Sequence, residues 1–225
     1  MMPATWNLAP PPGFRGLDPH KPLTVYHRHL PHWRQDGASY FVTFRLADSL
    51  PQTKLRELAL YKEEWERTHP PPRSDKDLDQ FAKDTFARVE GWLDQGMGAC
   101  WLRQAWAGQI VDDALRFFDG SRYELGSFVV MPNHVHAIVR PLEPEIQPLE
   151  KILQSRKRTT AQQINEGLRT RGQLWQDESF DRIIRDEQHL YRCIQYIGNN
   201  PRKARLAQNE WTRWIRPEWD ELGWG

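Results

Sequence analysis

The chain lacks any long apolar run and has few cysteines. No stretch reaches the roughly 18 apolar residues that a membrane helix needs. The opening residues, MMPATWNLAPPPGFRGLDPH, do not show the charged-then-apolar layout of a secretory signal. Cys100 and Cys193 provide neither a disulfide framework nor metal-ligand spacing, and both are expected to be buried and reduced. We therefore expect a soluble, cytoplasmic protein without membrane contact.

Composition allows a sizeable core but gives only a local signal for a partner. The chain has 225 residues, 39% of them hydrophobic, and a net charge of +1. Residues 151–171 nevertheless carry six Lys or Arg against one Glu, whereas residues 51–120 carry ten against thirteen Asp or Glu. The basic stretch fits either a phosphate-binding surface or an ordinary solvated helix face. The eleven Trp residues are equally open, since those in polar surroundings fit base stacking or packing of a tail.

Hydrophobic periodicity divides the chain into an irregular N-terminal arm (1–23), a main domain (24–206) and a Trp-rich C-terminal tail (207–225). Within the domain, SYFVTFRL predicts a strand, three helical stretches fill 51–120, and RYELGSFVVMP and HVHAIVRP predict a hairpin. A helix, a short strand or loop and a final helix that stops at Pro201 follow. This order predicts an α+β fold: a ferredoxin-like antiparallel sheet with helices on one face and a helical insertion between its first two strands.

The motif MPNHVH places two histidines at alternate positions of a predicted strand. His134 and His136 would therefore point to the same face, where two imidazoles can reach one divalent metal. Such pairs also occur by chance on solvated strands, and one ion needs further ligands. The pair alone leaves both interpretations open.

The motif YIGNNP places a phenol and an amide on one helix face. Tyr196 and Asn200 are four residues apart, hence neighbours. The Asn oxygen suits Mg²⁺ or Mn²⁺, and the phenol would lie beside a phosphate bound there. A core tyrosine and a helix-end asparagine are the alternative. Tyr191, five residues before Tyr196, lies on another face and is not an equivalent nucleophile.

Four blocks taken in order, FVVMPNHVHAIVRP, KILQSRKRTTAQQIN, WQDESFDRIIRDEQHL and YIGNNPRKA, resemble the REP-associated tyrosine transposases of the single-tyrosine (His-hydrophobic-His) transposase superfamily. The segment YHRHLPHWRQDGASYFVTFRLADSLP also resembles the way one branch begins. The resemblance covers about residues 24–206. Residues 51–120 match a longer branch, and no site residue is carried over from them.

The resemblance implies a metal-dependent enzyme that nicks and joins DNA. It assigns His134, His136 and Asn200 as ligands of Mg²⁺ or Mn²⁺, and Tyr196 as the nucleophile that forms a 5′-phosphotyrosine. Its implied substrate is single-stranded or hairpin DNA, especially repeated extragenic palindromes, which would place the protein at the nucleoid. Some relatives exchange the tyrosine helix within a dimer, but a monomer is the expectation here.

DNA contacts are predicted on two segments. Arg156, Lys157 and Arg158 are placed to neutralise phosphates, and Arg28 and Trp33 to meet bases or backbone. Each of the five is equally open to being a surface residue without a partner.

Three points stay open at this level. No general base can be assigned among His189, Glu187 and Asp181. A transposase-derived protein that binds single-stranded or hairpin DNA without cleaving it would keep the same motifs. A hydrolase that activates water would need the histidines but not Tyr196.

Overall fold

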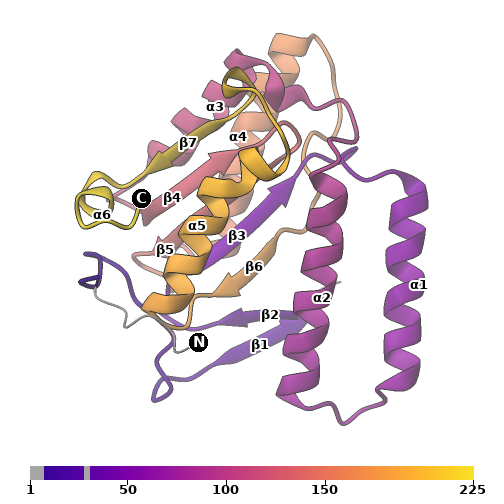
Figure 1. Ribbon diagram of the computed structural model, residues 1–225, viewed down its shortest axis with the longest axis vertical. Helices are drawn as coiled ribbons and strands as arrows, with labels where there is room; N and C mark the ends of the chain where they lie inside the picture. Colours follow the sequence, from indigo (N-terminus) through magenta and orange to yellow (C-terminus); the bar gives the residue numbers. More distant parts are fainter. Residues whose placement is uncertain (1–7, 28–30) are drawn as a thin grey trace.

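A computed structural model describes residues 8–27 and 31–225, and it is built on one five-stranded antiparallel sheet (Figure 1). The strands are β3 (Tyr40–Arg45), β4 (Tyr123–Val130), β5 (His134–Pro141), β6 (Phe180–Ile183) and β7 (Thr212–Ile215). Their spatial order is β6-β3-β5-β4-β7. Without β7, this is the order of a ferredoxin-like fold, in which two strand-helix-strand units interlock. The predicted α+β class and antiparallel sheet are confirmed.

Both faces of the sheet are buried, because helices cover both. Along β3, Val42 and Phe44 pack on one face with α3 (Ala105–Arg116) and α4 (Leu149–Leu168). Phe41, one residue out of phase, packs on the other face with α5 (Glu187–Lys203). Figure 1 shows α5 in front of the sheet and α3 and α4 behind it. The prediction that the helices share one face is therefore wrong: the final helix crosses to the opposite face.

The helical insertion lies between β3 and β4, the first two strands of the sheet, as predicted. It contains α1 (Gln52–Thr68), α2 (Asp75–Leu93), a short 3-10 turn η1 (Trp101–Arg103) and α3. The Ser74 hydroxyl caps α2 by accepting the Asp77 N–H. Helices α1 and α2 form a hairpin at the side of the sheet, with α2 on the inner side (Figure 1). The hairpin has a small core of its own around Leu50, Trp92 and Leu93.

A second, two-stranded sheet precedes the main one and was not predicted. Strand β1 (Thr24–His27) pairs antiparallel with β2 (Pro31–Arg34). Its strand β2 contacts β6 at the edge of the main sheet. None of the helices in the described part of the chain is long and apolar enough to cross a bilayer.

The two ends of the chain pack on the domain and on each other. Residues 207–225, treated above as a tail, supply η2 (Gln208–Glu210), the edge strand β7 and α6 (Pro217–Glu221). Trp219 and Trp224 are buried, and their indoles donate to the carbonyls of Pro12 and Ala9. A Cβ at Gly126 would lie 2.2 Å from the Trp219 ring, so glycine is required there. A domain boundary at residue 206 would separate the edge strand β7 from its sheet. Trp219 and Trp224 pack the C-terminal segment against the N-terminal one.

Candidate active site

The two histidines of MPNHVH lie on the sheet face that α5 covers. In the sheet, His134 is opposite Arg45 and His136 is opposite Thr43. Both side chains are buried, and their ring centroids are 4.7 Å apart. The prediction that both imidazoles point the same way is confirmed.

Helix α5 brings the YIGNNP residues onto the histidines. It begins at an Asp186 cap and runs two residues beyond Pro201 to Lys203, so the predicted stop at Pro201 is slightly early. The Tyr196 and His136 ring centroids are 5.2 Å apart. Asn200 is buried, and its Nδ2 lies 3.2 Å from His136 Nε2. The sheet and the late helix therefore converge, as the sequence hypothesis requires.

A third element, α2 of the insertion, adds a carboxylate to this group. Glu90 is 3% exposed, and its Oε2 lies 3.1 Å from His136 Nε2. The same oxygen accepts the hydrogen bond of the Tyr196 hydroxyl. One ligand atom each from Glu90, His134 and His136 lies within 4.8 Å of the others. Glu90 thus links the tyrosine to the histidines.

Sequence reasoning missed Glu90, because the insertion was given no site residues. A signal was present in the helical pattern. Glu90 falls among the apolar residues Phe86, Val89 and Leu93 of α2. A carboxylate buried without a partner is costly, so a charge on the apolar face of α2 indicates a partner inside the protein.

The hydrogen bonds around His134 determine which ring nitrogen carries its proton. The side-chain amide of Asn133 donates to the carbonyls of Leu93 (3.3 Å) and Met97 (3.1 Å), which turns its Oδ1 toward His134. His134 Nδ1 lies 2.7 Å from that oxygen and must donate to it. The lone pair of His134 is therefore on Nε2, the nitrogen that faces the site. A hydrogen-bonded second nitrogen is typical of metal-binding histidines.

Several buried atoms of the site lack a hydrogen-bond partner within the described residues. They are His134 Nε2, Glu90 Oε1 and Asn200 Oδ1. Leaving such groups unpaired costs about 1–3 kcal/mol each, and three of them in one cluster need an explanation. Two imidazole nitrogens, a carboxylate and an amide oxygen form a set of electron-pair donors that suits a divalent cation such as Mn²⁺ or Mg²⁺. The residues present therefore fit a metal site.

The electrostatics of the cluster also favour a cation. Burial, with the nearby His136, lowers the pKa of His134 to about 3, so its ring is neutral and can coordinate. Burial opposes ionisation of Glu90, yet the facing His136 and the hydrogen bond from Tyr196 outweigh it and lower the Glu90 pKa to about 2. Burial and the Glu90 charge raise the pKa of Tyr196 well above its usual value. Glu90 is thus an anion whose neighbour Tyr196 keeps its proton.

Two of the predicted phosphate contacts are buried and bonded within the protein, and their contact with DNA stays a prediction. Arg156 and Lys157 lie on α4, which packs on the sheet face away from Tyr196, and both are buried. Arg156 donates to the Ala114 carbonyl at 3.1 Å. Lys157 donates to the carbonyls of Gln176 (2.8 Å) and Asp177 (3.1 Å). Both cations therefore bond to backbone carbonyls of other segments of the chain.

The other three predicted DNA contacts have different outcomes. Arg158 is exposed on α4, away from the site, and its contact with DNA stays a prediction. Trp33 is half-buried and lines the same cleft as Tyr196. Arg28 lies outside the described residues.

Within the described part of the chain, none of the three general-base candidates forms a hydrogen bond with Tyr196. Asp181 is held by His32 and Arg34. His189 accepts the Arg185 N–H at 3.1 Å, and burial with nearby arginines lowers its pKa to about 4. Glu187 lies in the first turn of α5, two turns or more before Tyr196. Glu90 is the carboxylate that accepts the hydrogen bond of the Tyr196 hydroxyl.

Comparison with known proteins gives one structural likeness. No protein-family model matches the chain, and no curated protein matches its sequence. Among solved structures, the chain is similar to a REP-associated tyrosine transposase bound to a REP hairpin, at 17% sequence identity. The match covers 80% of this chain and 73% of the other, with a TM-score of 0.35. A likeness of this size does not establish a family, so the functional conclusion rests on the geometry of the site.

Proposed function

We propose that this protein is a metal-dependent enzyme that nicks and rejoins single-stranded or hairpin DNA through a covalent bond to Tyr196. One observation carries the proposal: a tyrosine hydroxyl, a buried carboxylate and two buried imidazoles converge from α5, α2 and β5. The motif resemblance described above supplies the substrate class, with REP-like hairpins as its first candidate. A monomer suffices, because the described part of a single chain brings all four side chains together.

The residues divide the work as follows. His134, His136, Glu90 and Asn200 would hold the cation, whose charge offsets negative charge that builds on the scissile phosphate. Tyr196 Oη attacks phosphorus, and a new O–P bond forms as the bond to the leaving 3′-oxygen breaks. Glu90 Oε2 accepts the phenol hydrogen bond and would take the phenol proton only with the cation bound, because without it the Tyr196 pKa lies far above that of Glu90. The leaving oxygen ends as a 3′-hydroxyl after gaining a proton. A later 3′-hydroxyl reverses these steps, because the phosphotyrosine conserves the energy of the broken bond.

A labelled oligonucleotide gives the direct test. A hairpin with a single-stranded flank, labelled 3′ of the candidate nick, is incubated with the protein and Mn²⁺ and run on a denaturing gel. We expect a protein-linked product that Tyr196→Phe abolishes while DNA binding persists. Tyr191→Phe serves as the matched control and should keep the adduct.

The same gel separates the rival activities. Free labelled ends without an adduct would indicate a hydrolase that uses water, and the tyrosine role would be rejected. Binding without any cleavage, with Mn²⁺ present, would indicate a protein that only binds DNA. A Tyr196→Phe protein that still nicks would overturn the proposal directly.

A further inference from the structure

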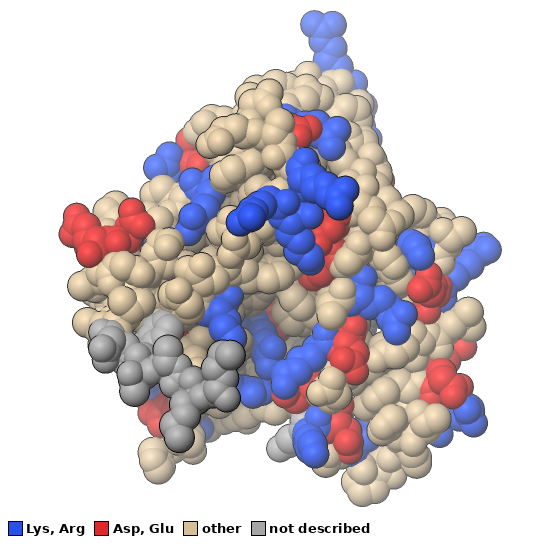
Figure 2. Space-filling model, viewed as in Figure 1, with Lys and Arg blue, Asp and Glu red and all other residues tan. Residues whose placement is uncertain are grey.

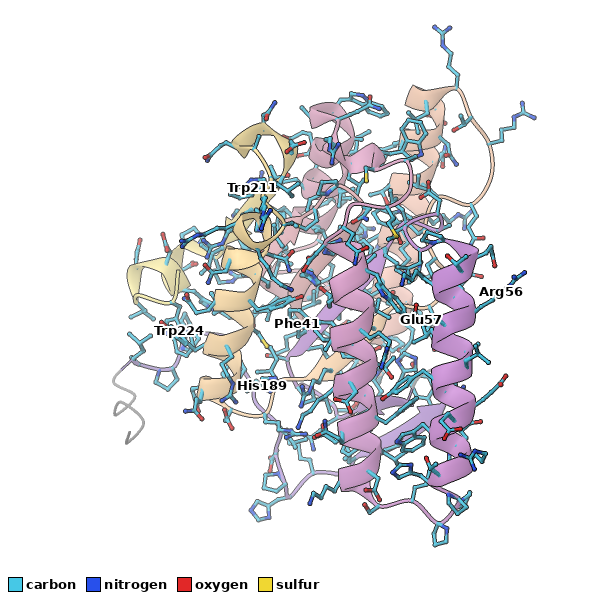
Figure 3. The ribbon with its side chains drawn as sticks, turned by 45° about the vertical axis from the view of Figure 1, so that its right-hand side comes forward. Phe41, Arg56, Glu57, His189, Trp211 and Trp224 are labelled. Atoms are coloured by element: carbon cyan, nitrogen blue, oxygen red, sulfur yellow. The ribbon has the colours of Figure 1, made fainter. Side chains whose placement is uncertain are left out.

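A cleft of about 580 Å³ opens beside Tyr196, and the proposed nicking reaction does not use it. Helix α2, strand β6 and helix α5 form its walls, and Trp33 lies at its far side. Phe41, on the floor of this region, lies between α5 and α2 (Figure 3). The volume of the cleft falls in the range of small-ligand pockets and is too small for a duplex.

The cleft walls carry aromatic rings that lead away from Tyr196. The ring centroids of Phe86 and Phe180 are 4.4 Å apart, and Phe86 is 6.1 Å from Tyr196. Both phenylalanines are only half-buried, so part of each ring is open to a ligand. Aromatic faces of this kind bind unpaired bases by stacking.

Cations border the same cleft. A single carboxylate, that of Asp79, bridges Lys83 (2.7 Å), Arg182 (3.2 Å) and Arg185 (2.7 Å). Arg192, which is exposed on α5, makes no ion pair with any described residue. Figure 2 shows Lys and Arg gathered over the middle of this face, in front of α5 and toward α2.

The remaining acids of the cleft are engaged elsewhere. Asp181 is bonded to His32 and Arg34, and Asp186 caps α5. Four cations thus face one shared carboxylate, and the surplus is positive. Such a combination of rings and surplus cations suits a nucleotide, which has a flat base and an anionic phosphate.

We propose that the cleft holds one unstacked nucleotide of a single DNA strand, directly beside the phosphate that Tyr196 attacks. The base lies against the Phe86 and Phe180 rings, and Arg192 with the Asp79-bridged cations binds the backbone. This assignment rests on the proposed function for its substrate. Because stacking is tolerant of base identity, the site requires a base but not a particular one.

An abasic scan tests the assignment without requiring cleavage. A hairpin oligonucleotide with a single-stranded flank is made with an abasic site at each flank position in turn. Binding to the Tyr196→Phe chain is measured by fluorescence anisotropy with Mn²⁺. We expect one position at which loss of the base weakens binding about 5- to 100-fold. Replacing that base by any other should change affinity by less than threefold.

Variants connect that position to the cleft. In Phe180→Leu, the penalty for that abasic site should disappear, because the ring that stacks on the base is gone. Arg192→Gln should reduce the slope of log affinity against log salt by about 0.7. Arg202→Gln, an exposed arginine on the same helix outside the cleft, is the matched control and should change neither. Thermal melts identify any variant that fails to fold.

The possible outcomes separate this inference from the proposed function. A penalty that persists in both Phe180→Leu and Phe86→Leu, or is absent at every position, overturns the cleft assignment even if Tyr196 forms an adduct. A penalty that vanishes in those variants supports the cleft, even in a protein that never nicks DNA.

Discussion

Two clusters of buried polar side chains lie on opposite faces of the sheet, and they differ in how completely their atoms are paired. On the α4 side, Asp181 binds His32 at 2.6 Å and both ends of the Arg34 guanidinium at 2.5 and 2.9 Å. The second nitrogen of His32 lies 3.0 Å from Glu178, and Arg34 also reaches Glu150 at 2.5 Å. Every charged group of this network has an opposite charge beside it.

On the α5 side, the cluster of Glu90, His134, His136 and Asn200 keeps three buried atoms without partners. Both clusters combine histidines with carboxylates, although Arg34 and Glu150 are more exposed than any residue of the α5-side cluster. In the α4-side cluster, the ion pairs connect β2 to β6 and α4. In the α5-side cluster, the unpaired atoms keep electron pairs that a cation could bind. Several unpaired buried atoms gathered in one place, rather than histidine or carboxylate as such, distinguish the α5-side cluster.

The largest expected difference between the clusters is in cation-dependent cleavage. His136→Ala removes a ligand and a contact to Tyr196, so we expect cleavage to fall at least about 10³-fold. The rise in melting temperature on adding Mn²⁺ should also disappear, because ligand binding stabilises only a site that can bind. His69→Ala, at the C-terminal cap of α1, is the control and should keep both effects. A His136→Ala chain that still gains stability from Mn²⁺ would place the cation elsewhere.

Substitution in the α4-side cluster around Asp181 should lower stability and leave cleavage unchanged. Arg34→Met leaves Asp181 buried with less compensation, and we expect unfolding free energy to fall by about 3–5 kcal/mol. Cleavage per folded molecule should change little, because Arg34 lies on the other face of the sheet. Arg56, which projects from α1 at the edge of the molecule (Figure 3), gives the control Arg56→Met with little loss. Chemical denaturation with an activity assay in native buffer measures both quantities.

A smaller effect on cleavage is expected for Glu90→Gln, which keeps the shape of the side chain and removes its charge. Cleavage should fall about 10²-fold or more, since proton acceptance by a placed base contributes about 10² to 10⁴. Without added cation, the unfolding free energy should fall modestly, because the surroundings of Glu90 lower its pKa and so favour the anion that the substitution removes. With the cation bound, the loss should be larger. Glu57→Gln, on exposed α1, is the control. Equal loss of stability with and without cation would make Glu90 part of the structural network instead.

The contrast between the clusters also marks what the sequence can predict. The histidine pair and the Tyr196–Asn200 pair each lie within one regular element, so strand and helix periodicity predicts their common faces. Glu90 enters from an insertion, and its partnership with Tyr196 exists only once α2 leans on α5. The burial of Arg156 and Lys157 could not be predicted from the basic run, because charge alone does not show which face of α4 is buried. The switch of α5 to the second face similarly depends on tertiary packing.

The pH dependence of stability should report on His32, in the α4-side cluster. Burial alone would lower the pKa of His32, but its bonds to Asp181 and Glu178 outweigh burial and raise that pKa to about 9. Because the folded pKa lies above the unfolded value near 6.5, protonation of His32 stabilises the fold fully below pH 6.5. That contribution declines as pH rises from 6.5 through 9. We expect His32→Gln to be less stable than the parent by roughly 1–3 kcal/mol at pH 6. The gap should narrow by pH 9.5, whereas the exposed His20→Gln control should match the parent throughout. A gap that stays constant across this range would mean that His32 is held by packing, and the claim that the network works through completed charge pairing would fail at its central residue.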